Sequence, residues 1–320
     1  MKIGVYGGTF NPIHLGHLEA ARFAIEYLHL DRLYLIPAGI PPHKQLAGDT
    51  PAPEQRLEMV RLASDAIGPA AQADDLELRR EGRSYTLDTL RLLKNRHPKD
   101  RLYLLMGMDM FLTFHLWRDP QEIVKLCTLC AFGRSEKDSE ELFSVQRAYL
   151  AETLGADVVT LSLPHIVDIS STQLRGMLAE GRGREYLEPA VYGYILREGL
   201  YGVTRDLKDL SLEELRFASI SMLRHKRVPH VLGTEETAAR LALRWGEDEE
   251  TARRAALLHD CTKKLDGEQH REIFRQYNVS LDPEEWREEK LYHAISGAAV
   301  AKHVFGVSPE IERAIRWHTT

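Results

Sequence analysis

Two histidines near the start of the 320-residue chain, His14 and His17, follow a glycine turn in a pattern typical of phosphate binding. The segment GGTFNPIHLGH, residues 7–17, comes after the apolar run KIGVYGG and leads into a helix-like stretch. Backbone N–H groups at such a turn and at the start of a helix can face a polyphosphate. Because residues three apart share one face of a helix, both imidazoles can contact one phosphate group. The segment is not a P-loop, since no G-K-[ST] sequence ends it.

A second segment, ISSTQLR at residues 169–175, has the form of a helix start. Ser170 and Ser171 are typical N-cap residues, and the N–H groups of a helix start can hold phosphate. Arg175, one helical turn further on, can add a planar positive fork to the same oxygens. We therefore expect this helix start to take part in the same phosphate site.

A histidine and an aspartate lie side by side at positions 259 and 260, in the apolar helical segment ALLHDCTKK. Neighbouring side chains of this kind can hold one or two metal ions, although a histidine beside a capping aspartate is also common without metal. Three further segments with histidines, RVPHVLGT, LYHAISGAAVAKH and RWHTT, favour the metal hypothesis. Imidazole with carboxylate suits iron, manganese or zinc, and the sequence does not choose among these metals.

The elements that must position these residues alternate through the first two hundred positions. Apolar runs predict strands over 2–8, 32–39, 101–109, 128–134 and 158–163, and helix-like segments fall near 17–29, 53–67, 86–96 and 139–154. This rhythm predicts an α/β doubly wound parallel sheet with helices on both faces. Ligands of such sheets bind beyond the carboxyl ends of the strands, where the turns at 7–8 and 107–109 should lie.

Strand patterns nearly stop after residue 202, and the remainder reads as helices near 212–224, 234–245, 249–264 and 308–317. Because 320 residues suit about two domains, we expect a first domain over 1–202, a linker over 203–211 and an all-α domain over 212–320.

Composition limits the classes of function. The chain is 43% hydrophobic and 28% charged, which is ordinary for a globular protein. No apolar run approaches the roughly 20 residues that span a bilayer, and no signal peptide is evident, so we expect no membrane partner and a cytoplasmic location. A formal net charge of −6 argues against nucleic acid as a partner. The three cysteines, Cys127, Cys130 and Cys261, are too few for a disulfide framework, and we interpret the C-x-x-C pair as structural.

The first domain resembles the nucleotidylyltransferase superfamily through His14-Leu15-Gly16-His17 and the ISSTxxR form of residues 169–175. Within that superfamily, PPHK at 41–44, SYTLDT at 84–89, GMD at 107–109 and Trp117 are similar to nicotinate mononucleotide adenylyltransferases. These enzymes join ATP and nicotinate mononucleotide. The expected reaction is attack by the mononucleotide phosphate on the α-phosphorus of ATP, with release of pyrophosphate and with Mg²⁺ bound mainly to the phosphates.

The resemblance implies a role for each matching residue. His14, His17, Lys44 and Arg175 would align the phosphates and neutralise their charge. Gly7, Gly8, Thr9, Phe10, Gly107, Asp109, Arg134, Ile169, Ser170, Ser171 and Thr172 would bind ATP. Tyr85 and Thr86 would bind the carboxylate or ribose of the mononucleotide, and Trp117 would stack on its pyridine ring. Two positions depart from the family pattern: Asn11 replaces a frequent Asp, and Ser135 replaces a frequent proline after Arg134.

The second domain resembles the HD phosphohydrolase superfamily, and its segments look like those of bacterial symmetrical diadenosine tetraphosphate hydrolases. The resemblance implies that the metal ligands are His230, His259, Asp260, His293 and His318, with Lys263 placed to meet phosphate. His225 and His303 do not match the pattern, and we interpret them as surface or packing residues. The family continues into another helix with a metal-binding Asp, whereas this sequence ends at Thr320. We therefore expect an incomplete metal site with weak or no hydrolysis of diadenosine tetraphosphate.

Two alternatives stay open. In the first, the second domain is a non-catalytic module that binds a nucleotide or forms a homo-oligomer and so modulates the first domain. In the second, the first domain accepts another phosphate ester, such as phosphopantetheine. The sequence does not determine the oligomeric state.

Overall fold

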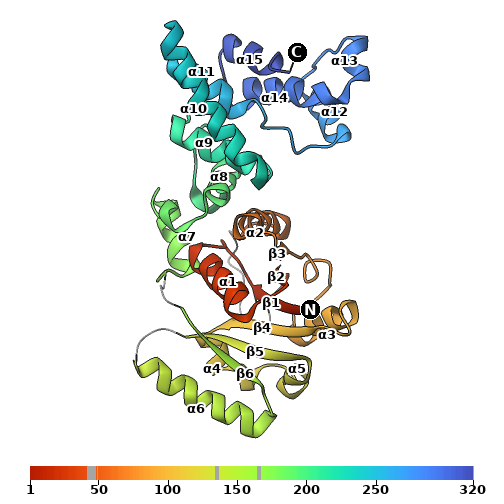
Figure 1. Cartoon of the computed structure of the whole chain (residues 1–320), viewed down its shortest axis with the longest axis vertical. Coiled ribbons are helices and arrows are strands. Elements are labelled where there is room, and N and C mark those ends of the chain that lie inside the picture. Colours follow the sequence, from red (N-terminus) through yellow and green to blue (C-terminus); the bar gives the residue numbers. More distant parts are fainter. Residues whose placement is uncertain (42–47, 49, 134–136, 164–166, 320) are drawn as a thin grey trace. The chain divides into compact units, whose positions relative to one another are not determined.

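The computed structural model describes residues 1–41, 48, 50–133, 137–163 and 167–319 (Figure 1). The chain forms two compact units, Met1–Glu188 and Pro189–Thr320. Among the helices of the described residues, none combines the length and the apolar character needed to cross a membrane.

The first unit is built on a parallel sheet of six strands in the order β3-β2-β1-β4-β5-β6. The strands are β1 (Lys2–Gly8), β2 (Arg32–Pro37), β3 (Ala71–Ala73), β4 (Arg101–Gly107), β5 (Cys127–Gly133) and β6 (Val158–Ser162). All five neighbouring pairs are parallel. The predicted doubly wound sheet is thus confirmed. The direction of winding reverses between β1 and β4, and ligands of such sheets bind at this reversal.

Helices cover both faces of the sheet. They are α1 (Leu15–Leu28), α2 (Pro53–Ile67), α3 (Thr86–Arg96), α4 (Met108–Leu112), α5 (Pro120–Leu126), α6 (Lys137–Leu154) and α7 (Ser171–Ala179). Ile3 and Val5 of β1 belong to one apolar core with α3, α5 and α6. Helices α1 and α2 pack against each other on the opposite face, where Gly4 leaves room for Leu30 and Leu33.

The second unit is helical, as predicted. It contains α8 (Pro189–Glu198), α9 (Leu212–Ser221), α10 (Val228–Trp245), α11 (Glu249–Leu258), α12 (Gly267–Gln276), α13 (Pro283–Arg287), α14 (Tyr292–His303) and α15 (Pro309–Arg316). Three predicted bounds of this unit differ from the structure by three residues or more. Helix α9 ends at Ser221 rather than 224. Helix α10 begins at Val228 rather than 234, because Pro229 suits a first helical turn. Helix α11 ends at Leu258 rather than 264, because the following turn bonds Cys261 N–H to the Leu258 carbonyl, three residues back.

The division between the units lies earlier than the linker expected over 203–211. Helix α8 packs on α9 so closely that a Cβ at Gly193 would lie 1.9 Å from the Phe217 carbonyl oxygen. Leu210, within the expected linker, is buried in the core of the second unit. Residues 189–202 therefore pack with the helical unit, although no break in the sequence separates them from the α/β segments that precede them.

Candidate functional site

The two histidines of the glycine turn are in ring-to-ring contact at the start of α1. His14 is the N-cap residue, and its ring centroid lies 3.8 Å from that of His17. The His14 backbone N–H donates to Nδ1 of His17 over 3.2 Å. Because Nδ1 of His17 accepts this bond, the proton of the neutral ring is assigned to Nε2. His17 thus carries a hydrogen-bond donor on the ring edge opposite its backbone contact.

Both imidazoles are neutral near pH 7. Burial lowers the pKa of His14 to about 4. Burial, and then the charge of His14, hold the pKa of His17 well below its ordinary value. Nδ1 of His14 and Oδ1 of Asn11 are buried, and neither has a hydrogen-bond partner among the described residues. Buried polar atoms are rarely left without partners, so this loop has hydrogen-bonding capacity available for a ligand.

Helix α7 brings the second predicted motif to this loop. Ser170 caps α7 and accepts from the Gln173 backbone N–H, as predicted for an N-cap. The Ser171 hydroxyl donates to the Pro12 carbonyl over 3.0 Å, and Arg175 Nη1 donates to the Asn11 carbonyl over 2.7 Å. The start of α7 is thus fixed beside the loop that precedes α1. Two segments about 160 residues apart in sequence therefore form one corner, which we call the α1–α7 corner.

A cavity of about 330 Å³ begins at the same turn. Its walls combine the end of β1 with residues predicted to bind the mononucleotide. The lining residues are Gly8, Thr9, Ala38, Pro41, Ser84, Tyr85, Thr86, Met110, Trp117, Arg118 and Ile123. Arg118 stacks over the Tyr85 ring at 4.5 Å from its centroid. The structure therefore places Tyr85, Thr86 and Trp117 together around an opening with an aromatic wall.

The other predicted residues of this unit vary in their placement. Gly107 ends β4, the strand next to β1, and Asp109 lies exposed in the first turn of α4. Phe10 is buried and packs edge-on against Tyr6 and His17, so its ring supports the site from within. Lys44 and Arg134 lie outside the described residues.

Arg56 is a site residue that the sequence analysis missed. Its side chain on α2 is 1% exposed and donates to the carbonyls of Thr9 at 2.9 Å and Ala38 at 2.7 Å. A weaker contact reaches the Gly39 carbonyl at 3.5 Å. These carbonyls belong to the loops that follow β1 and β2. The guanidinium therefore ties together two loops that form the wall of the cavity.

Replacing Arg56 by methionine is expected to destabilise the first unit. The substitution keeps most of the apolar stem but leaves the carbonyls of Thr9 and Ala38 buried without these donors, at a cost of about 1–3 kcal/mol each. We expect a lower first transition in thermal unfolding, with the second unit's transition unchanged. Arg61→Met, at an exposed position of the same helix, is the matched control, and an equal shift in both variants would contradict the assigned role.

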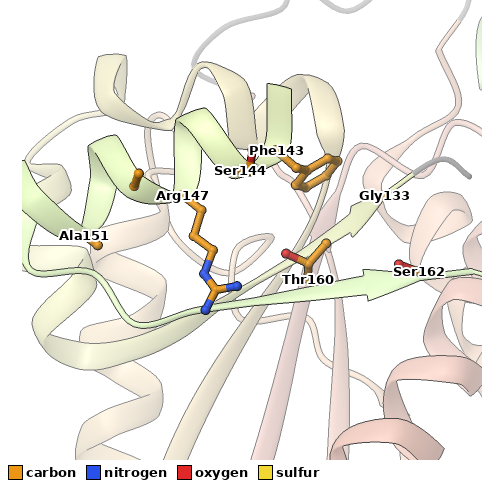
Figure 2. Close-up of a pocket in the computed structure, with 8 residues that line it drawn as sticks. Gly133, Phe143, Ser144, Arg147, Ala151, Thr160 and Ser162 are labelled. Atoms are coloured by element: carbon orange, nitrogen blue, oxygen red, sulfur yellow. The ribbon is translucent and has the colours of Figure 1, made fainter. Parts of the chain in front are cut away.

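A second cavity, of about 430 Å³, lies between α6 and the strands β5 and β6. Figure 2 shows Arg147 extending from α6 toward the strands, with Thr160 and Ser162 on the opposite wall. Within the described part of the chain, none of the residues predicted for ATP or the mononucleotide lines this cavity. We therefore do not include it in the candidate site.

Four histidines of the second unit gather around one buried carboxylate. Asp260 is fully buried, and His230, His259, His293 and His318 surround it; we call these five residues the His–Asp cluster. Nε2 of His259 lies 3.3 Å from Oδ2, and Nε2 of His293 lies 3.5 Å from Oδ1. Two overlapping groups have ligand atoms spaced for a metal ion: His230 with His259 and Asp260, and Asp260 with His293 and His318. The structure therefore brings together all five predicted ligands.

Backbone carbonyls orient three of the imidazoles in the same way. Nδ1 of His259 lies 2.6 Å from the Ala256 carbonyl, Nδ1 of His293 lies 2.8 Å from that of Lys290, and Nδ1 of His318 lies 2.6 Å from that of Ile315. Each contact assigns the ring proton to Nδ1 and leaves the Nε2 lone pair facing Asp260. Metal-binding histidines are commonly held in this manner. The donor set therefore fits a transition metal.

A buried polar network supports the cluster from behind. The Thr262 hydroxyl donates to the His293 carbonyl over 2.8 Å and contacts the Ser296 hydroxyl, which also meets Nδ1 of His270. The sequence analysis did not identify His270, since it matched no pattern. Burial alone would raise the pKa of Asp260, but His259, His318 and Arg227 hold it well below its usual range. Asp260 is thus ionised across the physiological range, as a metal ligand must be.

The three cysteines and His303 lie outside both candidate sites. Cys127, Cys130 and Cys261 are free and buried, and burial raises the pKa of each thiol, to about 12 for Cys130 and Cys261. These neutral thiols favour the structural interpretation. His303 stacks flat on Tyr277 with centroids 4.6 Å apart.

Comparisons with known proteins agree with this division of chemistry. Residues 5–177 match the cytidylyltransferase-like family, and residues 227–320 match the HD domain. The probable nicotinate-nucleotide adenylyltransferases of Pelobacter propionicus and Citrifermentans bemidjiense are 38% and 39% identical to this chain; each alignment covers 63% of it and 98% of the relative.

A solved structure of Plasmodium falciparum nicotinic acid mononucleotide adenylyltransferase complexed with NaAD shares the fold, with a TM-score of 0.51 and 20% identity over 63% of this chain and 98% of that one. The family match spans more than half of the chain and contains both segments predicted to bind phosphate, 7–17 and 169–175. The chain therefore belongs to the cytidylyltransferase-like family and carries an HD domain after its nucleotidyltransferase unit.

Proposed function

We propose that the first unit transfers the adenylyl group of ATP to nicotinate mononucleotide, giving deamido-NAD and pyrophosphate. One observation carries the proposal: the neutral histidine pair and the start of α7 meet at the loop whose residues Gly8 and Thr9 line the aromatic cavity. The α1–α7 corner suits a polyphosphate, and the cavity suits a flat ring with a polar substituent. The names of the bacterial relatives support the same reaction.

In the proposed reaction, an oxygen of the mononucleotide phosphate bonds to the α-phosphorus of ATP while the bond to the bridging oxygen breaks and pyrophosphate leaves. The reactants supply the chemistry, so the protein aligns them and stabilises charge on the transferring group. Nε2–H of His17 donates to a phosphate oxygen, and the α7 backbone N–H groups hold a second one. Arg175 adds positive charge beside them while it fixes the loop through Asn11. Mg²⁺ accompanies ATP in this proposal.

The acid form of the mononucleotide is expected to be the preferred acceptor. Tyr85 and Thr86 at the cavity wall offer two hydroxyl donors and the Thr86 N–H at the start of α3, which match a carboxylate and meet an amide NH₂ group unfavourably. We expect kcat/KM for nicotinate mononucleotide to exceed that for nicotinamide mononucleotide by about a hundredfold or more. A panel with ATP, Mg²⁺, both mononucleotides and phosphopantetheine measures this directly.

The same panel includes Trp117→Ala, which should raise KM for the mononucleotide far more than KM for ATP. Trp245→Ala, at an exposed position of the second unit, is the control. Equal kcat/KM for the two mononucleotides would disprove the specificity, and preferred turnover of phosphopantetheine would replace the proposed acceptor.

For the second unit we propose metal-dependent hydrolysis of a nucleotide phosphoanhydride, with diadenosine tetraphosphate as the substrate to test. His230, His259, Asp260, His293 and His318 would hold iron, manganese or zinc, which when bound polarises a phosphate and activates water. Lys263, whose Nζ lies 2.9 Å from Nε2 of His293, lines the same cavity as these ligands. Turnover of diadenosine tetraphosphate by the manganese-loaded chain tests the proposal. Nucleotide binding without turnover would favour a non-catalytic regulatory module.

We also propose a cytoplasmic location, because three free buried thiols suit a reducing compartment and both proposed reactions use nucleotides. Cell fractionation with an antibody to the chain tests this location.

A further inference from the structure

Two positively charged side chains contact atoms of the His–Asp cluster that would bind a metal. Arg227, at the start of α10, places both Nε and Nη2 at 2.5 Å from Oδ2 of Asp260. Lys263 places Nζ at 2.9 Å from Nε2 of His293. Each of the two groups with metal-like spacing therefore has one of its ligand atoms engaged by a positively charged side chain.

The Arg227 contact competes directly with a metal ion. Oδ2 of Asp260 is also the oxygen closest to His230 and His259, at 3.9 and 3.3 Å from their Nε2 atoms. A carboxylate oxygen has two lone pairs, and the two guanidinium N–H donors use both. A metal that binds Oδ2 with these histidines must therefore displace the guanidinium.

The displaced guanidinium would remain in a cavity with little negative charge. The cavity beside the cluster has a volume of about 540 Å³, and both Arg227 and Lys263 line it. Asp260 is the only carboxylate among its described lining residues, and five of the others are alanines: Ala238, Ala252, Ala255, Ala256 and Ala314. With a divalent metal on Asp260, two protein cations and the metal would face a single carboxylate. An anion entering the cavity would balance this charge.

We propose that Arg227 is an exchangeable counter-ion: it holds Asp260 when the cluster is metal-free, and it binds a phosphate group when metal is present. Metal and phosphate then bind cooperatively, because the metal releases the arginine that the phosphate requires. The inference rests on the metal site proposed above and adds to it a residue that couples metal binding to substrate binding.

Calorimetric titration of the full-length, chelator-treated chain with Mn²⁺ tests whether Arg227 competes with the metal for Asp260. Arg227→Gln removes the competing cation, so we expect about tenfold tighter binding of Mn²⁺ than in the wild type. The metal-free variant should also unfold at a lower temperature, because Asp260 loses its closest partner. Arg224→Gln, an exposed residue three positions earlier with the same change in charge, is the matched control and should bind Mn²⁺ as the wild type does. Arg227→Lys keeps a cation near Asp260 and should lie closer to the wild type than Arg227→Gln.

Titration with inorganic phosphate tests whether bound metal makes Arg227 available to a phosphate group. In the wild type, Mn²⁺ should tighten phosphate binding about tenfold, and in Arg227→Gln this gain should be lost.

Equal Mn²⁺ affinity in the wild type and Arg227→Gln would overturn the counter-ion role. Tighter Mn²⁺ binding with an unchanged phosphate gain would overturn the coupling. Absence of Mn²⁺ binding in every variant would overturn the metal site itself, and the inference with it. If Arg227→Gln fails to fold, Arg227→Lys replaces it: its ammonium cannot reproduce both guanidinium contacts with Oδ2, so it should bind Mn²⁺ more tightly than Arg224→Gln does, and an equal or weaker affinity would overturn the role.

Discussion

Replacement of His17 by alanine is expected to lower kcat of adenylyl transfer by about a hundredfold or more, as the loss of one charge-stabilising donor does in other active sites. The structure gives the physical reason. Nδ1 of His17 accepts from the His14 backbone, so Nε2–H is left to donate to the transferring phosphate. This bond should strengthen as charge redistributes in the transition state, so KM for ATP should move less than kcat.

A second replacement of His17 tests whether this residue acts as a neutral hydrogen-bond donor or as a cation. Because burial holds the pKa of His17 well below its ordinary value, the free enzyme presents a neutral imidazole. His17→Gln keeps an N–H donor near the position of Nε2 and should retain more activity than His17→Ala. His14→Ala is the parallel test, and His115→Ala, at an exposed position of the same unit, is the control. Near-normal kcat in His17→Ala would remove this residue from the catalytic role.

The features that sequence predicted are those encoded by local spacing. His14 and His17 meet because three residues make about one turn of α1, and Ser170 caps α7 because the ISST segment has the side chains of an N-cap. The five long strands carry apolar runs that only a buried sheet satisfies. Three-residue β3 carries no such run, and its residues are only partly buried, so its pattern resembles a loop.

Other features depend on contacts that leave no local pattern. Arg56 interrupts the apolar face of α2 as a solvent-facing arginine would, yet its partners are backbone carbonyls of distant loops. Helix α14 is buried from Tyr292 to Ala301 and so lacks the polar face by which an amphipathic helix is recognised. Arg227 was missed because its role depends on Asp260, 33 residues away.

Removal of the central pair of the His–Asp cluster is expected to abolish metal binding. His259 belongs to the first group of ligands, and Asp260 belongs to both groups. A double variant, His259→Ala with Asp260→Ala, therefore leaves neither group with three ligands. We expect the wild type, grown with added iron and manganese, to carry a transition metal in elemental analysis, and the double variant to carry at most about a hundredth of that amount, since each lost ligand typically costs tenfold or more in affinity.

Two controls separate loss of ligands from loss of structure. His225→Ala with His303→Ala removes two histidines of the same unit that lie outside the cluster, and should keep the metal. Asp260→Asn keeps the volume of the side chain and removes its charge, so it should lose metal while circular dichroism shows that the helices persist. Because the three carbonyl-oriented imidazoles keep their Nε2 lone pairs in Asp260→Asn, residual binding there measures what the histidines contribute alone. Equal metal content in the wild type and the double variant, or none in either, would show that the cluster is not a metal site, and the second unit would then act as a nucleotide-binding or dimerising module.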